Sequence, residues 1–130
     1  MRGSAEYRTI AVGGPYAVTV DGFEAQFATN HLGHFLFTNL IRPQLLASSA
    51  PRVVNVSSNG HRLSDIRYDD VGFSGGKTYD MWKAYGQSKT ANMLFAVGLT
   101  QRGIPAFSLH PGGAPRHSAS LGFLLTFARP

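Results

Sequence analysis

Two short apolar segments on either side of a helical segment restrict the possible folds of this chain most strongly. The first, Arg-Val-Val-Asn-Val at 52–56, is almost continuously apolar, which is typical of a strand covered on both faces in a parallel sheet. Residues 80–102 have a helical pattern that stops at Gly103, and residues 104–109 form the second apolar segment. Strand, helix and strand make a βαβ unit, so the sequence predicts an α/β fold.

The helical segment carries a pair of side chains with a possible chemical role. Tyr85 and Lys89 are four residues apart and therefore share one helix face. A free tyrosine hydroxyl has a pKa of about 10, and a nearby ammonium favours the ionised form. Such a tyrosine can serve as a general acid and base. The same spacing is common on solvated helix faces, so the pair alone leaves both interpretations open. The apolar residues predicted to form the buried stripe of this helix are Trp82, Met93, Leu94 and Val97.

A second helix is predicted over residues 23–41, which have a broad apolar face. Asp21 has the position of its N-cap, and Glu24 three residues later completes a capping box. Pro43 ends this helix or kinks it before residues 44–46. The helix is therefore expected to begin just after Asp21 and to be interrupted near Pro43.

Three polar residues lie inside the second helix. Asn30 is a poor helix former, which indicates either a specific role or a solvent-facing position. His31 and His34 are three residues apart, but two histidines without a third ligand do not make a metal site. We interpret them as packing or surface residues and predict no metal.

The residues after the first strand are polar. Ser57 and Ser58 follow its carboxyl end, where the binding and catalytic groups of such sheets lie. Residues 59–79 form a long connection with several glycines, and a connection of this length is usually functional or mobile.

Composition excludes several other classes of protein. The chain has 130 residues, 43% hydrophobic and 15% charged, which suits one globular domain. It has no cysteine, which excludes disulfides and thiolate metal sites, and no apolar run long enough to span a membrane. The net charge is +5, which suits either a dinucleotide phosphate or a merely basic surface. No nucleic-acid motif is present, so we expect a cytoplasmic protein that does not bind nucleic acid.

Four phrases occur in an order that resembles the short-chain dehydrogenase/reductase family, and most closely its retinol-dehydrogenase-like branch. They are Asn-His-Leu-Gly-His-Phe at 30–35, Arg-Val-Val-Asn-Val-Ser-Ser at 52–58, Tyr-x-x-Ser-Lys at 85–89 and Leu-His-Pro-Gly at 109–112. The resemblance covers residues 15–113 and leaves 114–130 as a divergent tail. It implies a single partial Rossmann-like domain over 1–130, with a parallel sheet of two or three strands flanked by helices.

The resemblance implies an NAD(P)-dependent oxidoreductase that interconverts an alcohol and a carbonyl. In this mechanism Tyr85 donates or accepts the proton of the substrate hydroxyl, and Lys89 lowers the pKa of Tyr85. Ser58 holds the substrate oxygen. Asn30 positions a water in the proton relay. The residues implied for binding of NAD or NADP are Tyr85, Lys89, Pro111 and Gly112.

The chain also departs from the family pattern. No glycine-rich phosphate-binding turn of the form G-x-x-x-G-x-G or G-x-G-x-x-G is present. Residues 7–12 are a possible strand, and residues 121–127 are an apolar patch without assignment. The chain therefore resembles the catalytic half of such an enzyme without most of the N-terminal nucleotide-binding portion, and we expect it to have little or no activity by itself. The alternative is therefore a non-enzymatic interaction module, in which helix 23–41 and the Tyr85-bearing helix pair with a second copy in a homodimer or with a full-length relative.

Overall fold

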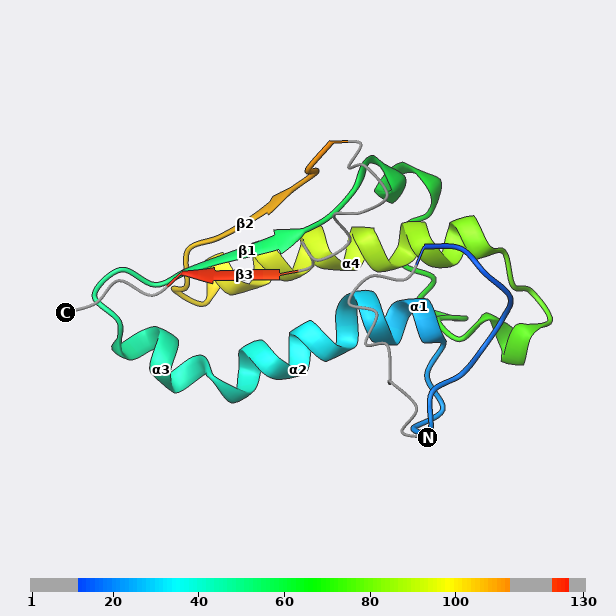
Figure 1. Ribbon diagram of the computed structural model, residues 1–130, viewed down its shortest axis with the longest axis horizontal. Helices are drawn as coiled ribbons and strands as arrows, with labels where there is room; N and C mark the ends of the chain where they lie inside the picture. Colours follow the sequence, from blue (N-terminus) through cyan, green and yellow to red (C-terminus); the bar gives the residue numbers. More distant parts are fainter. Residues whose placement is uncertain (1–11, 113–122, 127–130) are drawn as a thin grey trace, which may run out of the picture.

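The structure is a computed structural model that describes residues 12–112 and the strand 123–126. The α-helices are α1 (Ala25–Phe27), α2 (Gly33–Leu40), α3 (Arg42–Ala47) and α4 (Met81–Gln101), and the strands are β1 (Arg52–Val56), β2 (Ala106–Leu109) and β3 (Phe123–Thr126). A π-helical turn, Ala28–Leu32, joins α1 to α2, and 3-10 turns cover Asn59–Leu63 and Phe73–Gly76. In Figure 1, α4 runs along the sheet and the helical run from α1 to α3 extends beside it.

The sheet has the strand order β2-β1-β3. β1 and β2 pair in parallel, from Val53 with Ala106 to Val56 with Leu109, so the predicted α/β fold with a parallel pair is confirmed. The third strand, β3, pairs antiparallel with β1 and comes from the apolar patch that the sequence left without assignment. The strand predicted over residues 7–12 lies outside the described residues except for Val12, which is not in a strand.

The core lies where α4, the loop after it and β1 meet. Leu45, Val53, Leu99 and Ile104 form a cluster of fully or almost fully buried side chains. Their burial removes apolar surface from water and fixes α4 against the parallel pair of strands. This packing fixes the position of the Tyr85-bearing helix relative to the carboxyl ends of β1 and β2.

The buried face of α4 differs from the predicted stripe. Trp82, Leu94 and Val97 are about half exposed, at 49%, 49% and 54%. The residues that are buried instead are mostly small or polar: Ala84, Gly86, Gln87, Ser88, Lys89, Ala91, Asn92, Ala96 and Leu99. The prediction was wrong because small side chains let the 59–63 turn and the π-helical turn approach α4 closely, and the polar ones find partners there.

The first helix begins later than predicted. The N-cap is Glu24 rather than Asp21, because the Glu24 carboxylate accepts hydrogen bonds from the backbone N–H groups of Gln26 and Phe27 at 2.9 and 2.7 Å. Asp21 instead lies in a turn in which the N–H of Gly22 bonds to the carbonyl of Thr19. The predicted interruption near Pro43 is confirmed, since α2 ends at Leu40 and Pro43 lies in the first turn of α3.

The long connection after β1 is a folded loop organised by Asp70. The Asp70 carboxylate accepts hydrogen bonds from the Arg67 guanidinium, the Ser74 hydroxyl and the Thr78 hydroxyl. Hydrogen bonds from Thr78 and Arg67 lower the pKa of Asp70 to about 2. Phe73 is fully buried, and the Arg67 guanidinium lies 4.8 Å from the centre of its ring. These contacts explain how a polar segment with several glycines keeps one conformation.

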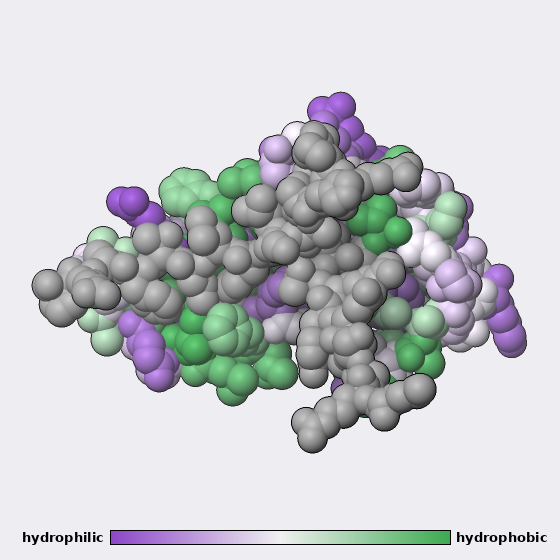
Figure 2. Space-filling view, viewed as in Figure 1, coloured by the Kyte–Doolittle hydropathy of each residue, from purple (hydrophilic) through white to green (hydrophobic). Residues whose placement is uncertain are grey.

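Apolar side chains are exposed along α2. Phe35, Leu36, Phe37 and Leu40 are 45%, 59%, 46% and 67% exposed. Figure 2 shows a hydrophobic patch over the region of α2 and α3. Of the helices in the described ranges, none is long and apolar enough to cross a membrane.

Candidate active site

The Tyr85 ring and the Ser58 hydroxyl both lie close to Gly60. A Cβ atom built on Gly60 would be 2.5 Å from Cε1 of Tyr85 and 3.4 Å from Oγ of Ser58. Ser58 is the N-cap of the 59–63 turn, and its Oγ accepts the backbone N–H of Gly60 at 3.1 Å. Both side chains can lie near this position because residue 60 is a glycine, whereas a larger residue would collide with the Tyr85 ring.

Lys89 lies against the same tyrosine. Its side chain is 2% exposed, and its Nζ is 5.5 Å from the centre of the Tyr85 ring. Nζ donates a hydrogen bond to the backbone carbonyl of Val56, the last residue of β1, at 3.2 Å. Burial lowers the pKa of Lys89 to about 8, because a low-dielectric environment disfavours the ammonium.

Asn30 lies in the middle of the π-helical turn and is 1% exposed, so the solvent-facing alternative is wrong. Its Nδ2 donates to Oγ of Ser88 at 3.0 Å, and Oγ of Ser88 donates to the carbonyl of Tyr85 at 2.7 Å. π-Helical turns are rare and are frequently found at functional sites. No pattern in the sequence predicted this turn, because the apolar spacing around it fits an ordinary helix.

Asn92, which the sequence analysis did not select, joins several parts of this site. It is 3% exposed, and its Nδ2 lies 3.0 Å from the carbonyl of Asn30 and 3.2 Å from the carbonyl of Val56. Its Oδ1 lies 3.1 Å from Nδ1 of His31. Like Asn30, Asn92 is a poor helix former inside a predicted helix, and this feature of the sequence marks both residues.

The two histidines of the π-helical turn and α2 are not simply surface residues. Burial is the main cause that lowers the pKa of His31 and of His34. The ring of His31 packs between Phe27 and Phe35, with centre-to-centre distances of 5.2 and 5.9 Å. His31 is thus a packing residue, as expected, but it also has a polar partner in Asn92.

The ends of the two parallel strands bring further polar groups to this edge. The register pairs Val56 with Leu109, so Ser58 and His110 follow neighbouring strand ends. A cavity of about 160 Å³ lies there, lined by Ser57, Ser58, Asn59, His61, Met93, Ser108, Leu109 and His110. Pro111 and Gly112 come next and are both exposed. Gly112 has a positive φ of 84°, and apart from its chain neighbours no atom of the described residues lies within 4 Å of the position of a Cβ.

Together these groups form a candidate proton-transfer site. A phenol, a serine hydroxyl and a buried ammonium lie close together at the carboxyl end of β1. A phenol can give up or accept a proton, and a serine hydroxyl can hold a substrate oxygen by a hydrogen bond. A positive charge near the ring stabilises negative charge that develops on the phenol oxygen. The arrangement suits acid–base chemistry on an oxygen-bearing carbon.

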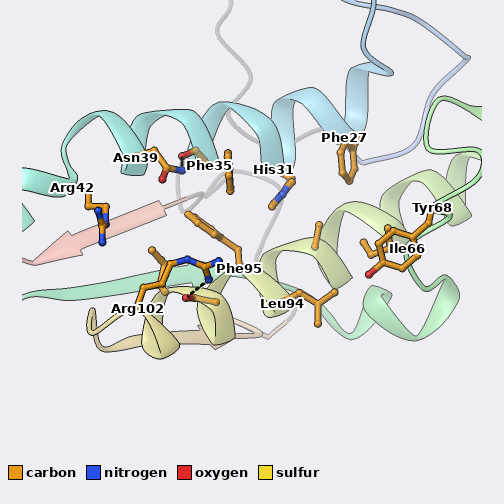
Figure 3. A pocket seen from close by; sticks show the side chains of 13 residues that line it. Phe27, His31, Phe35, Asn39, Arg42, Ile66, Tyr68, Leu94, Phe95 and Arg102 are labelled. Carbon is orange, nitrogen blue, oxygen red and sulfur yellow. Dashed lines mark hydrogen bonds between the residues drawn. The ribbon is translucent and has the colours of Figure 1, made fainter.

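A separate groove of about 400 Å³ lies between α2 and α4. Figure 3 shows its side chains: Phe27, His31, Phe35, Asn39 and Arg42 from the helical run α1–α3, Leu94, Phe95 and Arg102 from α4, and Ile66 and Tyr68 from the loop. The groove is mainly apolar, and neither Asn30 nor Ser88 is among its lining residues. None of the four predicted catalytic residues lines it.

Comparison with known proteins gives several related sequences. The chain is 47% identical over 102 residues to retinol dehydrogenase 12 of Mus musculus. The aligned segment covers 75% of this chain and 32% of that protein. The chain is also 47% identical over 107 residues to the short-chain dehydrogenase/reductase prx1 of Penicillium roqueforti, covering 76% of this chain and 31% of the relative. The chain therefore spans about a third of the length of these relatives. No protein-family model matches it.

A solved structure supports the same relationship. The crystal structure of an uncharacterised protein from Mycobacterium paratuberculosis superimposes with a TM-score of 0.69 and is 43% identical in sequence. The match covers 84% of this chain and 41% of that one. The sheet and the helices around the candidate site thus share their arrangement with a larger protein.

Proposed function

We propose that this chain, which belongs to the short-chain dehydrogenase/reductase family, carries the proton-transfer site of an NAD(P)-dependent oxidoreductase that interconverts an alcohol and a carbonyl. One observation carries the proposal: the nearly fully buried Lys89 ammonium lies beside the Tyr85 ring, and this ring and the Ser58 hydroxyl both lie close to Gly60. The relatives named as dehydrogenases support an oxidoreductase. The relatives' names do not give the substrate class or the cofactor of this chain, so the alcohol or carbonyl substrate and the nicotinamide cofactor are our proposal.

The chain's own residues would share the proton chemistry. In the direction of oxidation, Tyr85 removes the hydroxyl proton from the alcohol while Ser58 holds the same oxygen. Lys89 stabilises the negative charge on the phenol oxygen through its positive charge. Asn30 would position a water that carries the proton onward. A bound nicotinamide would accept the hydride from the carbon in this direction and supply it in reverse.

The residues present fit one part of such a cofactor. An ammonium has three N–H donors, and among the residues that the structure describes Lys89 has one hydrogen-bond acceptor, the Val56 carbonyl. Two donors remain to bind the hydroxyls of a ribose. By contrast, the sequence has no glycine-rich turn at a helix N-terminus that could hold a pyrophosphate. We therefore propose that this chain contacts the nicotinamide riboside half of the dinucleotide.

This division of contacts can be tested by saturation-transfer NMR of the chain with NADH and with NADPH. We expect the nicotinamide and neighbouring ribose protons to receive saturation and the adenine protons to receive little. Affinity should be weak, with a Kd of about 1 mM or higher, because the charged phosphates lack their charge-assisted hydrogen bonds. Lys89→Ala should remove the transfer, whereas Lys83→Ala, an exposed lysine on the same helix, should leave it unchanged. Saturation centred on adenine, or insensitive to Lys89→Ala, would reject the proposal.

We also propose that a second copy of the chain packs on the groove between α2 and α4. A mainly apolar groove of this size, beside exposed Leu36 and Leu40, marks an interaction surface. Pairing about a two-fold axis would place the same surface on both copies. Sedimentation equilibrium should show a dimer, and Leu36→Glu or Leu40→Glu should convert it to monomer. Val20→Glu, at a fully exposed valine away from the groove, should leave the dimer intact. A wild-type monomer at all concentrations would contradict this proposal.

A further inference from the structure

The hydrogen bonds of Asn92 define the orientation of its carboxamide. The backbone carbonyls of Asn30 and Val56 lie 3.0 and 3.2 Å from Nδ2, and carbonyl oxygens only accept hydrogen bonds. The NH2 group must therefore face these two carbonyls, one N–H toward each. The reverse orientation would place an acceptor against two acceptors, so the hydrogen-bond network settles the assignment.

This orientation fixes the tautomer of His31. With the NH2 group committed to two carbonyls, Oδ1 of Asn92 faces Nδ1 of His31 at 3.1 Å. An amide oxygen has no hydrogen to donate, so Nδ1 must carry one. Neutral His31 is therefore protonated on Nδ1 and has its acceptor at Nε2.

The two carbonyls that Asn92 holds belong to the candidate site. The carbonyl of Val56 also accepts the hydrogen bond from Nζ of Lys89, at 3.2 Å. The carbonyl of Asn30 lies in the π-helical turn, whose Asn30 side chain bonds to Ser88. The buried Asn92 side chain thus bonds to the backbone of Asn30, and it shares the Val56 carbonyl as an acceptor with Lys89.

The Asn92 backbone is held in place as well. Its carbonyl accepts a hydrogen bond from Nδ2 of Asn55, on β1, at 3.3 Å. The carboxamide is almost fully buried, so removal of its donors leaves two carbonyls that must find water or shift. The residues it joins come from the π-helical turn, β1 and α4, which are far apart in the sequence.

We propose that Asn92 is a positioning residue, which fixes the carbonyls of Asn30 and Val56 and, through Val56, the ammonium of Lys89. This proposal rests on the proposed function, because that function gives Asn30 and Lys89 their roles in proton transfer. Asn92 touches no reacting atom in this scheme; it acts through Lys89 and Asn30.

The test uses the full chain without cofactor. The chain has three lysines, Lys77, Lys83 and Lys89, so NMR can follow the titration of each side-chain ammonium separately. In Asn92→Ala, water enters beside the ammonium, and the pKa of Lys89 should rise by about one unit, a tenfold change in proton affinity. Lys77 and Lys83, both exposed, should not change. Leu99→Ala, which also loses buried contacts on α4 but away from the site, should lower stability without this rise.

A second measurement on the wild type avoids dependence on any variant. The imidazole ¹⁵N shifts should show that His31 is protonated on Nδ1. An Nε2-protonated His31, or a Lys89 titration that Asn92→Ala and Leu99→Ala alter equally, would overturn the proposal. Both the Lys89 titration and the His31 tautomer are measured without cofactor. If they succeed while the NADH and NADPH mapping fails, the proposed function is wrong and the positioning role falls with it. If they fail while the mapping succeeds, only the role of Asn92 is rejected.

Discussion

Tyr85→Phe is expected to lower kcat by about 10²–10⁴-fold in an enzyme that contains this site, the usual contribution of a general acid or base. The experiment requires a complete cofactor site. We therefore suggest a chimera in which this chain replaces the 102-residue segment of mouse retinol dehydrogenase 12 to which it is 47% identical. Retinol, for which that relative is named, serves as the substrate. Phenylalanine keeps the ring against Gly60 and removes only the hydroxyl.

A matched control separates this effect from a general loss of structure. Tyr68→Phe removes the same atom from a tyrosine that is 80% exposed and lines the groove rather than the candidate site, so it should leave kcat within about twofold. The loss in Tyr85→Phe should fall on kcat rather than on KM, because the hydroxyl acts in the transition state more than in substrate binding. A Tyr85→Phe chimera as active as its parent would assign Tyr85 a purely structural role.

The general fold was predictable because its signals are local. The strand at 52–56 and the helix that stops before Gly103 can each be recognised from a short stretch of sequence, and the structure contains both. The proximity of Tyr85 and Lys89 follows from their spacing on one helix. Ser58 could be placed because it directly follows a strand end.

Other parts could not be predicted because distant contacts decide them. The π-helical turn at 28–32 depends on Asn30 finding Ser88 and Asn92 across the interface with α4. The antiparallel strand β3 depends on pairing with β1, about 70 residues earlier in the chain. Neither partner is visible in a short window of sequence.

The buried face of α4 illustrates the same point. Large apolar residues usually mark the buried stripe of a helix, yet Trp82 and Leu94 are half exposed while Ser88 is fully buried. Half-exposed Leu94 lines the groove on which we propose that a second copy packs. The small and polar side instead serves the site, with Gly86 at its point of closest approach to the 59–63 turn.

This close approach leads to a second large expected effect, on stability. A Cβ on Gly86 would lie 2.8 Å from the backbone N of Ser64, 2.9 Å from the carbonyl O of Gly60 and 3.0 Å from Cβ of Leu63. Two of these contacts are backbone atoms, which cannot rotate away. Gly86→Ala should therefore destabilise the protein by about 1–3 kcal/mol, the typical cost of overpacking, even though alanine is the better helix former.

Gly98 provides the matched control on the same helix. A Cβ there would meet Nη1 of Arg102 at 3.3 Å, the end of a flexible and exposed side chain that donates to the carbonyl of Gly98 at 2.9 Å and needs to shift only slightly. Gly98→Ala should thus gain about 0.5–1 kcal/mol, the difference in helix propensity. Urea unfolding at one protein concentration, compared at equal m-values, measures both changes. Opposite signs in the two variants are the expected result. Equal stabilisation by both would mean that α4 and the 59–63 turn are not packed closely at Gly86, and the approach of Tyr85 and Ser58 to Gly60 would lose its structural basis.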